Sequence, residues 1–231
     1  MNVIKKFMFV ILIINILGCG ISLILQSSLG SDAITLLNEG IHIKLGISYT
    51  IAGLIYNGTL LLIALLLNKK SLGLGSCVYV LVAGIFIDLY IYLLLDFNIS
   101  SLGIIIRIMS FIIGHILMCS GFAMLIKFDI GMSPLDAILI YIEGKFKYPY
   151  KVLKTIADVI FLILGVYLGG NLGFGTIFSI LCTGTTISIV SKMISVNKKG
   201  ITQIYKLISE SMDNVYESFS IIRVNFYYKI L

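Results

Sequence analysis

Six long apolar stretches alternate with polar connections along the chain, and two shorter stretches of mixed character lie between them. Each long stretch is about long enough to cross a hydrocarbon layer of roughly 30 Å as a helix, the fifth only just. The six predicted transmembrane helices cover residues 7–25, 47–67, 76–95, 103–126, 152–168 and 174–194. The pattern therefore predicts an all-α membrane protein with six transmembrane helices.

The composition agrees with this class. Hydrophobic residues make up 59% of the 231 residues, charged residues 12%, and the mean hydropathy is +1.08, whereas a soluble domain carries about 25% charged residues. Lys5 and Lys6 precede an apolar stretch whose Cys19 loosely resembles a lipoprotein cleavage site. The stretch continues to Leu25 and recurs in the second half, which favours an uncleaved helix. The four cysteines lack metal-ligand spacing, so we expect neither a metal nor a disulfide framework.

The positive charges indicate how the chain is oriented. With the N-terminus in the cytosol, only Lys44 and Arg107 of the 17 Lys and Arg residues fall on the outer side. This excess of positive charge on one side predicts a multi-pass protein of the cytoplasmic membrane with both termini inside. Because the lysines flank apolar segments and do not gather on one soluble face, nucleic acid is not an expected partner. The expected partners are the lipid bilayer and a small solute.

An internal repeat divides the membrane part of the chain. The Leu-Gly-x-Gly block at residues 72–76 recurs at 172–176, and Asp-Ala-Ile at 32–34 recurs at 136–138. Three spans per copy is an odd number, so the second copy must enter the membrane from the opposite side, as in many secondary transporters. We therefore expect a first repeat at residues 1–100, an inverted repeat at 101–196 and an amphipathic cytosolic tail at 197–231.

The two mixed stretches, residues 31–46 and 133–148, are too polar for ordinary spans and too apolar for ordinary loops. Ser31-Asp32 and Ser133-Pro134 are typical helix starts, and the shared glycines Gly40 and Gly144 are expected to end these helices. A helix of about three turns covers roughly half of the hydrocarbon layer. Such helices could enter the bundle and return, or lie flat in the interface, and both alternatives stay open.

The second copy also carries a family pattern. Its first span is followed by Gly-Met-Ser-Pro-Leu-Asp at residues 131–136, and its third is preceded by Leu-Gly-Phe-Gly at 172–175. This combination resembles the YczE/YyaS/YitT family of bacterial polytopic membrane proteins over about residues 7–195. The first copy lacks the proline of this pattern. The resemblance implies a polytopic membrane protein and leaves its activity open.

Polar side chains inside predicted spans are the candidate binding residues, because a charge at the membrane centre normally faces a partner or water. The candidates within spans are Asn15, Asn57, Asp88, His115 and Asp158, and the starts of the short helices add Asp32 and Asp136. Each residue within a span has Gly or Ser on its own helical face, which favours contact with other helices over lipid.

Structural roles compete with binding at several of these positions. Lys154 lies one turn before Asp158, so an ion pair within the helix is as good an explanation as a functional role. His115 is more often a packing residue than a proton relay, and asparagines more often join helices. Asp88 has no cation nearby in the sequence, which favours a functional role.

These features favour a secondary transporter of a small solute, coupled to a cation or a proton, with sites between the repeats. The alternative is an accessory or substrate-capture subunit of a membrane complex. The sequence is also compatible with an oligomer. No nucleophile–base set, phosphate loop, metal motif or dinucleotide fingerprint occurs, so an enzyme and a cofactor are not expected.

Overall fold

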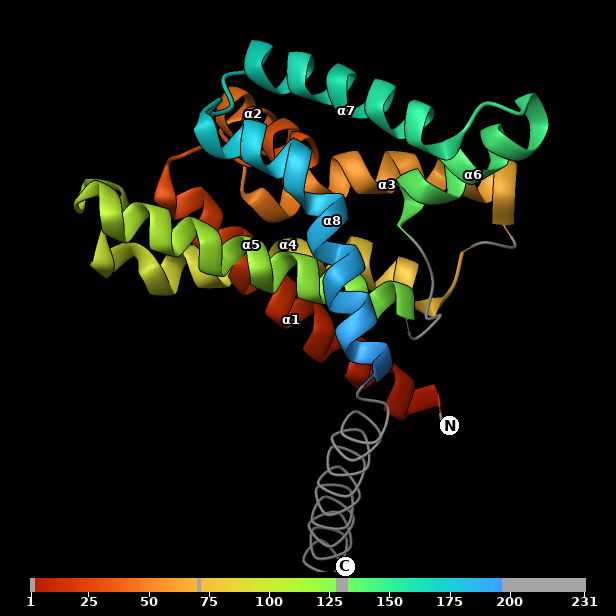
Figure 1. Ribbon diagram of the computed structural model, residues 1–231, viewed down its shortest axis with the longest axis horizontal. Coiled ribbons are helices and arrows are strands. Elements are labelled where there is room, and N and C mark those ends of the chain that lie inside the picture. Colours follow the sequence, from red (N-terminus) through yellow and green to blue (C-terminus); the bar gives the residue numbers. More distant parts are fainter. Residues whose placement is uncertain (1–2, 70–71, 128–132, 197–231) are drawn as a thin grey trace, which may run out of the picture.

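The computed structural model describes residues 3–69, 72–127 and 133–196, and within these ranges every regular element is a helix (Figure 1). The α-helices are α1 (Val3–Ser27), α2 (Ala33–Leu45), α3 (Tyr49–Asn68), α4 (Leu74–Leu94), α5 (Ile104–Lys127), α6 (Pro134–Phe146), α7 (Tyr150–Tyr167) and α8 (Phe174–Val196). Two 3-10 turns, η2 (Leu95–Phe97) and η3 (Ile99–Ser101), join α4 to α5. The all-α prediction is confirmed for these residues, and the predicted tail at 197–231 lies outside them.

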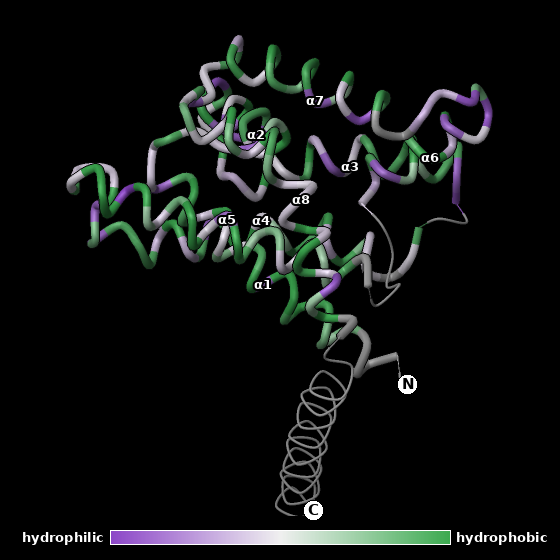
Figure 2. The backbone as a smooth tube through the Cα atoms, in the orientation of Figure 1, coloured by the Kyte–Doolittle hydropathy of each residue, from purple (hydrophilic) through white to green (hydrophobic). Residues whose placement is uncertain are grey.

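Five helices are long and apolar enough to cross a membrane, which makes the chain a multi-pass membrane protein by length and composition. They are Phe7–Ser27, Tyr49–Asn68, Gly75–Phe97, Ile104–Leu125 and Phe174–Ile194, and they match five of the six predicted spans. The remaining helix, α7, has 18 residues and contains Lys151, Lys154 and Asp158. Figure 2 shows hydrophilic turns along α7, in contrast to the nearly continuous hydrophobic path of α1. The sixth span and the inverted arrangement of six spans therefore stay predictions.

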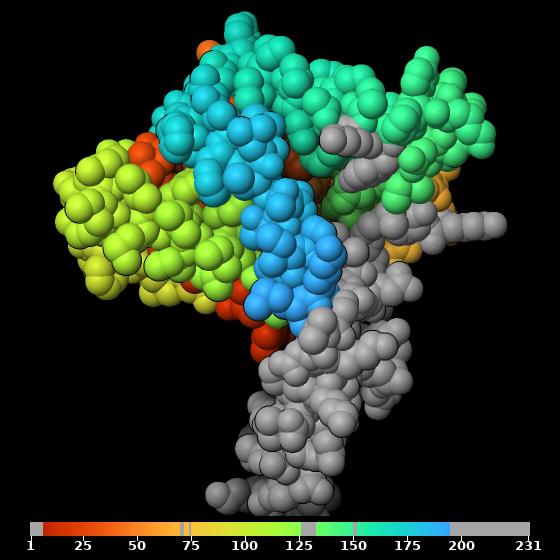
Figure 3. Space-filling view, in the orientation of Figure 1, coloured from red at the N-terminus to blue at the C-terminus, as the bar shows by residue number. Residues whose placement is uncertain are grey.

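Helix α1 forms the centre of one helix group, with α4 and α5 packed along it. Glycines allow its backbone to approach α5 directly: a Cβ atom on Gly20 would lie 2.5 Å from the backbone nitrogen of Met118 and 2.7 Å from the carbonyl oxygen of Gly114. Small residues at such crossings increase the contact between helices in lipid, where no hydrophobic force drives association. Helix α8 packs on α5 and lies at the surface of the molecule (Figure 3).

The other four helices, α2, α3, α6 and α7, form a second group that is joined to the first through contacts of α3 with α4 (Figure 1). The short helix α2 packs on α7, and the short helix α6 packs on α3. Each short helix therefore contacts a long helix from the other half of the chain. These partners lie far apart in the sequence: α7 begins 105 positions after the end of α2, and α6 begins 66 positions after the end of α3.

The contacts follow the repeat with one exception. Exchanging the two halves turns α1·α4 into α5·α8, α2·α7 into α6·α3, and α2·α3 into α6·α7, and all of these pairs are packed. The exception is α3·α4, which is extensive, whereas α7 has no comparable contact with α8. The two halves thus share a packing plan and differ in how their third and fourth helices meet.

The short helices begin as predicted and end later than predicted. Asp32 is the N-cap of α2, and Ser133 is the N-cap of α6 with Pro134 at its first position. The prediction that Gly40 and Gly144 end the helices is wrong, because α2 continues to Leu45 and α6 to Phe146. Gly40 instead permits close packing on α7, since a Cβ atom there would lie 2.6 Å from the carbonyl oxygen of Gly165.

Candidate functional site

A cavity of about 30 Å³ lies where the start of α2 meets α1, α3, α4 and α5. A water molecule needs roughly 10–15 Å³ of such space, so the cavity holds a small ion or one to two water molecules. Its polar and aromatic lining residues are Asp32, Thr35 and Asn38 of α2 with its cap, Tyr49 and Asn57 of α3, and Tyr79 of α4. Two of the seven predicted candidates, Asp32 and Asn57, therefore line the same space.

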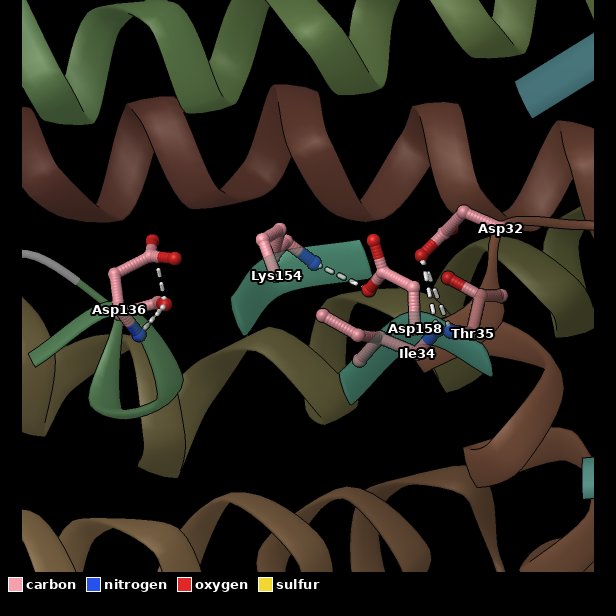
Figure 4. A network of polar contacts seen from close by, with 7 residues as sticks. Asp32, Ile34, Thr35, Asp136, Lys154 and Asp158 are labelled. Carbon is pink, nitrogen blue, oxygen red and sulfur yellow. Dashed lines mark hydrogen bonds and ion pairs between the residues drawn. The ribbon is translucent and has the colours of Figure 1, made fainter. Parts of the chain in front are cut away.

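The two carboxylate oxygens of Asp32 have different environments (Figure 4). Oδ2 accepts hydrogen bonds from the backbone N–H groups of Ile34 at 3.2 Å and Thr35 at 3.3 Å, which caps α2. Oδ1 is buried and has no hydrogen-bond partner among the described residues. A carboxylate at this end of a helix is favoured by the helix dipole. The cap therefore holds Asp32 in place while one oxygen remains available to a ligand.

Two asparagines add neutral polar groups to the cavity. Asn38 is 5% exposed, and its Oδ1 makes no hydrogen bond with any described residue. Asn57, on the facing helix α3, is 9% exposed. The Tyr49 hydroxyl donates to the carbonyl oxygen of Thr35 at 3.0 Å and so ties α3 to α2. A buried amide oxygen without a partner is costly, so Asn38 Oδ1 is a candidate acceptor for a water molecule, an ion or a polar ligand in the cavity.

Acids from both halves lie near this cavity. Asp158 of α7 forms an ion pair with Lys154, whose Nζ is 2.5 Å from Oδ1 (Figure 4). The carboxylates of Asp32 and Asp136 are close enough to Asp158 to interact with it electrostatically. Asp136 in turn accepts a hydrogen bond from the Ser133 hydroxyl at 2.8 Å. Carboxylates from both halves of the chain therefore lie in this part of the molecule, and the one at Asp158 is paired with an ammonium group.

Asp88 lies on α4 and binds the start of α3. Its Oδ1 accepts from the backbone N–H of Tyr49 at 3.1 Å, and its Oδ2 accepts from the backbone N–H of Thr50 at 2.7 Å and from the Thr50 hydroxyl at 2.5 Å. One turn earlier, a Cβ atom on Gly84 would lie 2.5 Å from the Cα atom of Thr50. Asp88 is thus the acceptor for the exposed N–H groups at a helix start, and it does not line the cavity.

The other two candidates lie away from the cavity. The Asn15 side-chain oxygen accepts a hydrogen bond from the Tyr90 hydroxyl at 2.9 Å and joins α1 to α4. His115 lies between α5 and α8, stacked on Phe111 and in edge contact with Phe178, and its Nε2 is 3.6 Å from the Cys119 sulfur. Both positions have the packing roles that compete with binding in membrane helices.

The sequence reasoning missed Asn38 and the cavity-lining tyrosines. A signal for Asn38 was present, because it lies three residues after Thr35 and therefore on the same helical face as a residue near the Asp32 cap. The start of α2 matches the start of α6 at an offset of 104 residues, so the counterpart of Asn38 in the second half is the apolar Ile142. A polar residue that breaks the repeat at a buried position indicates a role specific to one half.

Comparisons with known proteins give a family and no activity. Uncharacterized protein YyaS of Bacillus subtilis (strain 168) is 25% identical over 200 residues, which are 84% of this chain and 99% of that protein. An uncharacterized protein of Haemophilus influenzae is 25% identical over 191 residues, which are 83% of this chain and 85% of that protein. No solved structure matches the chain. The predicted resemblance is supported for the YyaS name, and its extension to YczE and YitT stays a prediction. Residues 4–192 match a family of unknown function, DUF6198, and the chain belongs to this family.

Proposed function

We propose that this membrane protein is a secondary transporter of a small solute, coupled to a cation or a proton. The observation that carries the proposal is the cavity at the start of α2, where the buried atoms Asp32 Oδ1 and Asn38 Oδ1 have no hydrogen-bond partner among the described residues. A helix of 13 residues is about 20 Å long, too short to cross the hydrocarbon layer. Binding sites at the ends of such broken or short helices are typical of secondary transporters.

The repeat supports a transport mechanism. In the proposed arrangement, α1–α4 and α5–α8 are inverted copies with three spans each, and α7 is the sixth span. Helix α3 is closed on α4, where Thr50 meets Gly84, whereas the corresponding Gly184 on α8 has no atom within 4 Å of a Cβ position. If the halves exchange these two conformations, α7 closes on α8 while α3 leaves α4. Such an exchange opens a central site alternately to the two sides.

Transport is tested with purified protein in proteoliposomes under a sodium or proton gradient, with uptake measured for a panel of amino acids, sugars, organic acids and small cations. We expect gradient-driven uptake of at least one solute by the wild type, and a loss of about tenfold or more in Asp32→Asn, since one charged contact is lost. Asp96→Asn, which removes the same charge at an exposed position between α4 and α5, is the matched control. Equal uptake by the wild type and Asp32→Asn contradicts the proposal.

The conformational exchange has its own test. Asp88 and Thr50 meet across α4 and α3, and their counterparts by repeat register are Ser188 and Lys151. In a background without native cysteines, the pair Lys151→Cys and Ser188→Cys is expected to crosslink and to stop transport until the bond is reduced. Lys151→Cys alone is the control. A crosslinked protein with full transport activity rules out closure of α7 on α8 as a step in transport.

The proposed orientation, with both termini in the cytosol, is tested by labelling single cysteines from outside. The α4–α5 and α7–α8 connections lie at one end of the molecule and the ends of α3 and α6 lie at the other (Figure 1). We therefore expect labelling at Asn98 and Asn171 and protection at Asn68 and Tyr148. Strong external labelling at Asn68 contradicts the inverted-repeat arrangement.

A further inference from the structure

We propose that the cavity at the start of α2 is a binding site for a monovalent metal cation of the sodium type, with Asp32, Asn38 and Asn57 as ligands. Its use as the coupling ion rests on the transport function proposed above, whereas binding itself does not. The site joins two elements, because Asp32 and Asn38 belong to α2 and its cap and Asn57 belongs to α3.

The donor atoms have the chemistry that a hard cation requires. Oxygen atoms of carboxylate and amide groups are the ligands of hard cations in proteins. Asp32 Oδ1 and Asn38 Oδ1 are buried and accept no hydrogen bond from a described residue. Asn38 and Asn57 are both more than nine-tenths buried and line the same space. A bound cation would satisfy these oxygens together, whereas a proton on Asp32 would satisfy only one of them.

Size and charge favour a monovalent cation over a divalent one. The cavity of about 30 Å³ has room for a small ion with at most one or two water molecules. Calcium takes 6–8 oxygen ligands, usually with several carboxylates, and magnesium usually keeps several waters. Asp32 is the one carboxylate that lines this cavity among the described residues. An anion is disfavoured, because the Asp32 carboxylate already occupies the helix start that would attract it.

The geometry also connects ion binding to helix packing. Asp32 Oδ2 holds the first turn of α2 through Ile34 and Thr35, while Oδ1 is buried without a partner among the described residues and Asn57 of α3 lines the same cavity. An ion held between Oδ1 and Asn57 would therefore fix the start of α2 against α3. Because the ion would bind only the folded form, its stabilising effect is expected to grow with the logarithm of the sodium concentration once this exceeds the dissociation constant.

The experiment measures the unfolding temperature of the purified full-length chain in detergent while NaCl replaces choline chloride at constant ionic strength. KCl, LiCl and CaCl₂ titrations serve as comparisons, and binding of radioactive sodium is measured on the same samples. We expect saturable binding of radioactive sodium and an unfolding temperature that rises with the logarithm of the sodium concentration above the dissociation constant. Binding should be weakened by about 10- to 100-fold in Asn38→Leu and in Asn57→Leu. Asp32→Asn keeps a good N-cap residue and removes the charge, so it should fold and lose the response. Asp96→Asn should respond like the wild type.

Each outcome bears on the proposal. The same unfolding temperature in sodium, potassium, lithium and choline overturns it, and so does a response to calcium alone or to acid alone. An unchanged sodium response in both Asn38→Leu and Asn57→Leu overturns the ligand assignment, even if Asp32→Asn fails to fold. Sodium binding without transport of any solute would refute the transporter and keep the site. Sodium-independent transport by a protein that does not bind sodium would refute the sodium site and keep the transporter.

Discussion

The contact between Asp88 and the start of α3 gives a quantitative prediction. The carboxylate accepts three hydrogen bonds, from the backbone N–H groups of Tyr49 and Thr50 and from the Thr50 hydroxyl. In Asp88→Asn, one carboxylate oxygen becomes an NH₂ group, which donates and cannot accept from these N–H groups. A hydrogen bond to a charged group contributes about 1.5–3 kcal/mol, and a charge at a helix start up to about 2 kcal/mol. We expect Asp88→Asn to lower the free energy of unfolding by about 2–4 kcal/mol.

The assay is reversible unfolding in mixed micelles of dodecyl maltoside and sodium dodecyl sulfate, combined with a double-mutant cycle. Thr50→Val removes only the hydroxyl donor, so we expect a loss of about 1 kcal/mol, and less than additive losses when it is combined with Asp88→Asn. Neutral hydrogen bonds between membrane helices average only about 0.6 kcal/mol, so a larger loss in Asp88→Asn identifies the contribution of the charge. Asp96→Asn, at an exposed position, is the control.

Unchanged unfolding of Asp88→Asn, together with additive effects of Thr50→Val, would refute this reasoning and return Asp88 to the list of ligand candidates. Asp88 and Asp32 should therefore differ in the effect of losing their charge. Asp88→Asn should lower stability and leave the cation response of the folded fraction intact, whereas Asp32→Asn should remove the cation response.

Three further changes test other contacts. Gly40→Ala should lower the free energy of unfolding by about 1–3 kcal/mol, because the added Cβ would collide with α7. The repeat-matched Gly144→Ala lies in open space and should be neutral or slightly stabilising. Thermal unfolding of both variants tests this difference. Arg107→Gln should cost about 1.5–3 kcal/mol in the same measurement, because the guanidinium donates to two carbonyl oxygens at the end of α1, and no loss would contradict this role. Asp158→Asn should lower transport. If Asp158 serves only to pair with Lys154, the double change with Lys154→Gln should restore transport. Failure of this rescue indicates a direct role for Asp158.

The repeat was the part of the sequence that predicted the site best. It placed Asp32 and Asp136 at the starts of equivalent helices, and both residues lie near Asp158 in the folded protein. Periodicity predicted the helical class and the caps, because these depend on neighbouring residues. The polar cavity itself could not be predicted, since it depends on which helices of the two halves meet.

Two contacts could not be predicted from the sequence for the same physical reason. Gly40 was expected to end α2, yet it permits the contact with Gly165, and both uses of glycine look the same in one sequence. For Asp88, the absence of a nearby cation in the sequence favoured a functional role, which stays a prediction. Its partners are backbone N–H groups 38 and 39 residues earlier, which every residue type except proline provides. Contacts made through the backbone leave no mark on composition or spacing.

The exchange of short helices between the halves has a consequence for biosynthesis. Helix α2 ends at Leu45, but its partner α7 is complete only at Tyr167, about 120 residues later. At a translation rate of about 5–20 residues per second, the ribosome needs roughly 6–24 s to produce that partner. During this interval the face of α2 that packs on Gly165, at Leu36 and Gly40, has no partner from its own half and is open to lipid, the translocon or an insertase. We therefore expect a ribosome that stalls before α7 to leave a membrane protein with this face uncovered, which quality-control proteases can recognise.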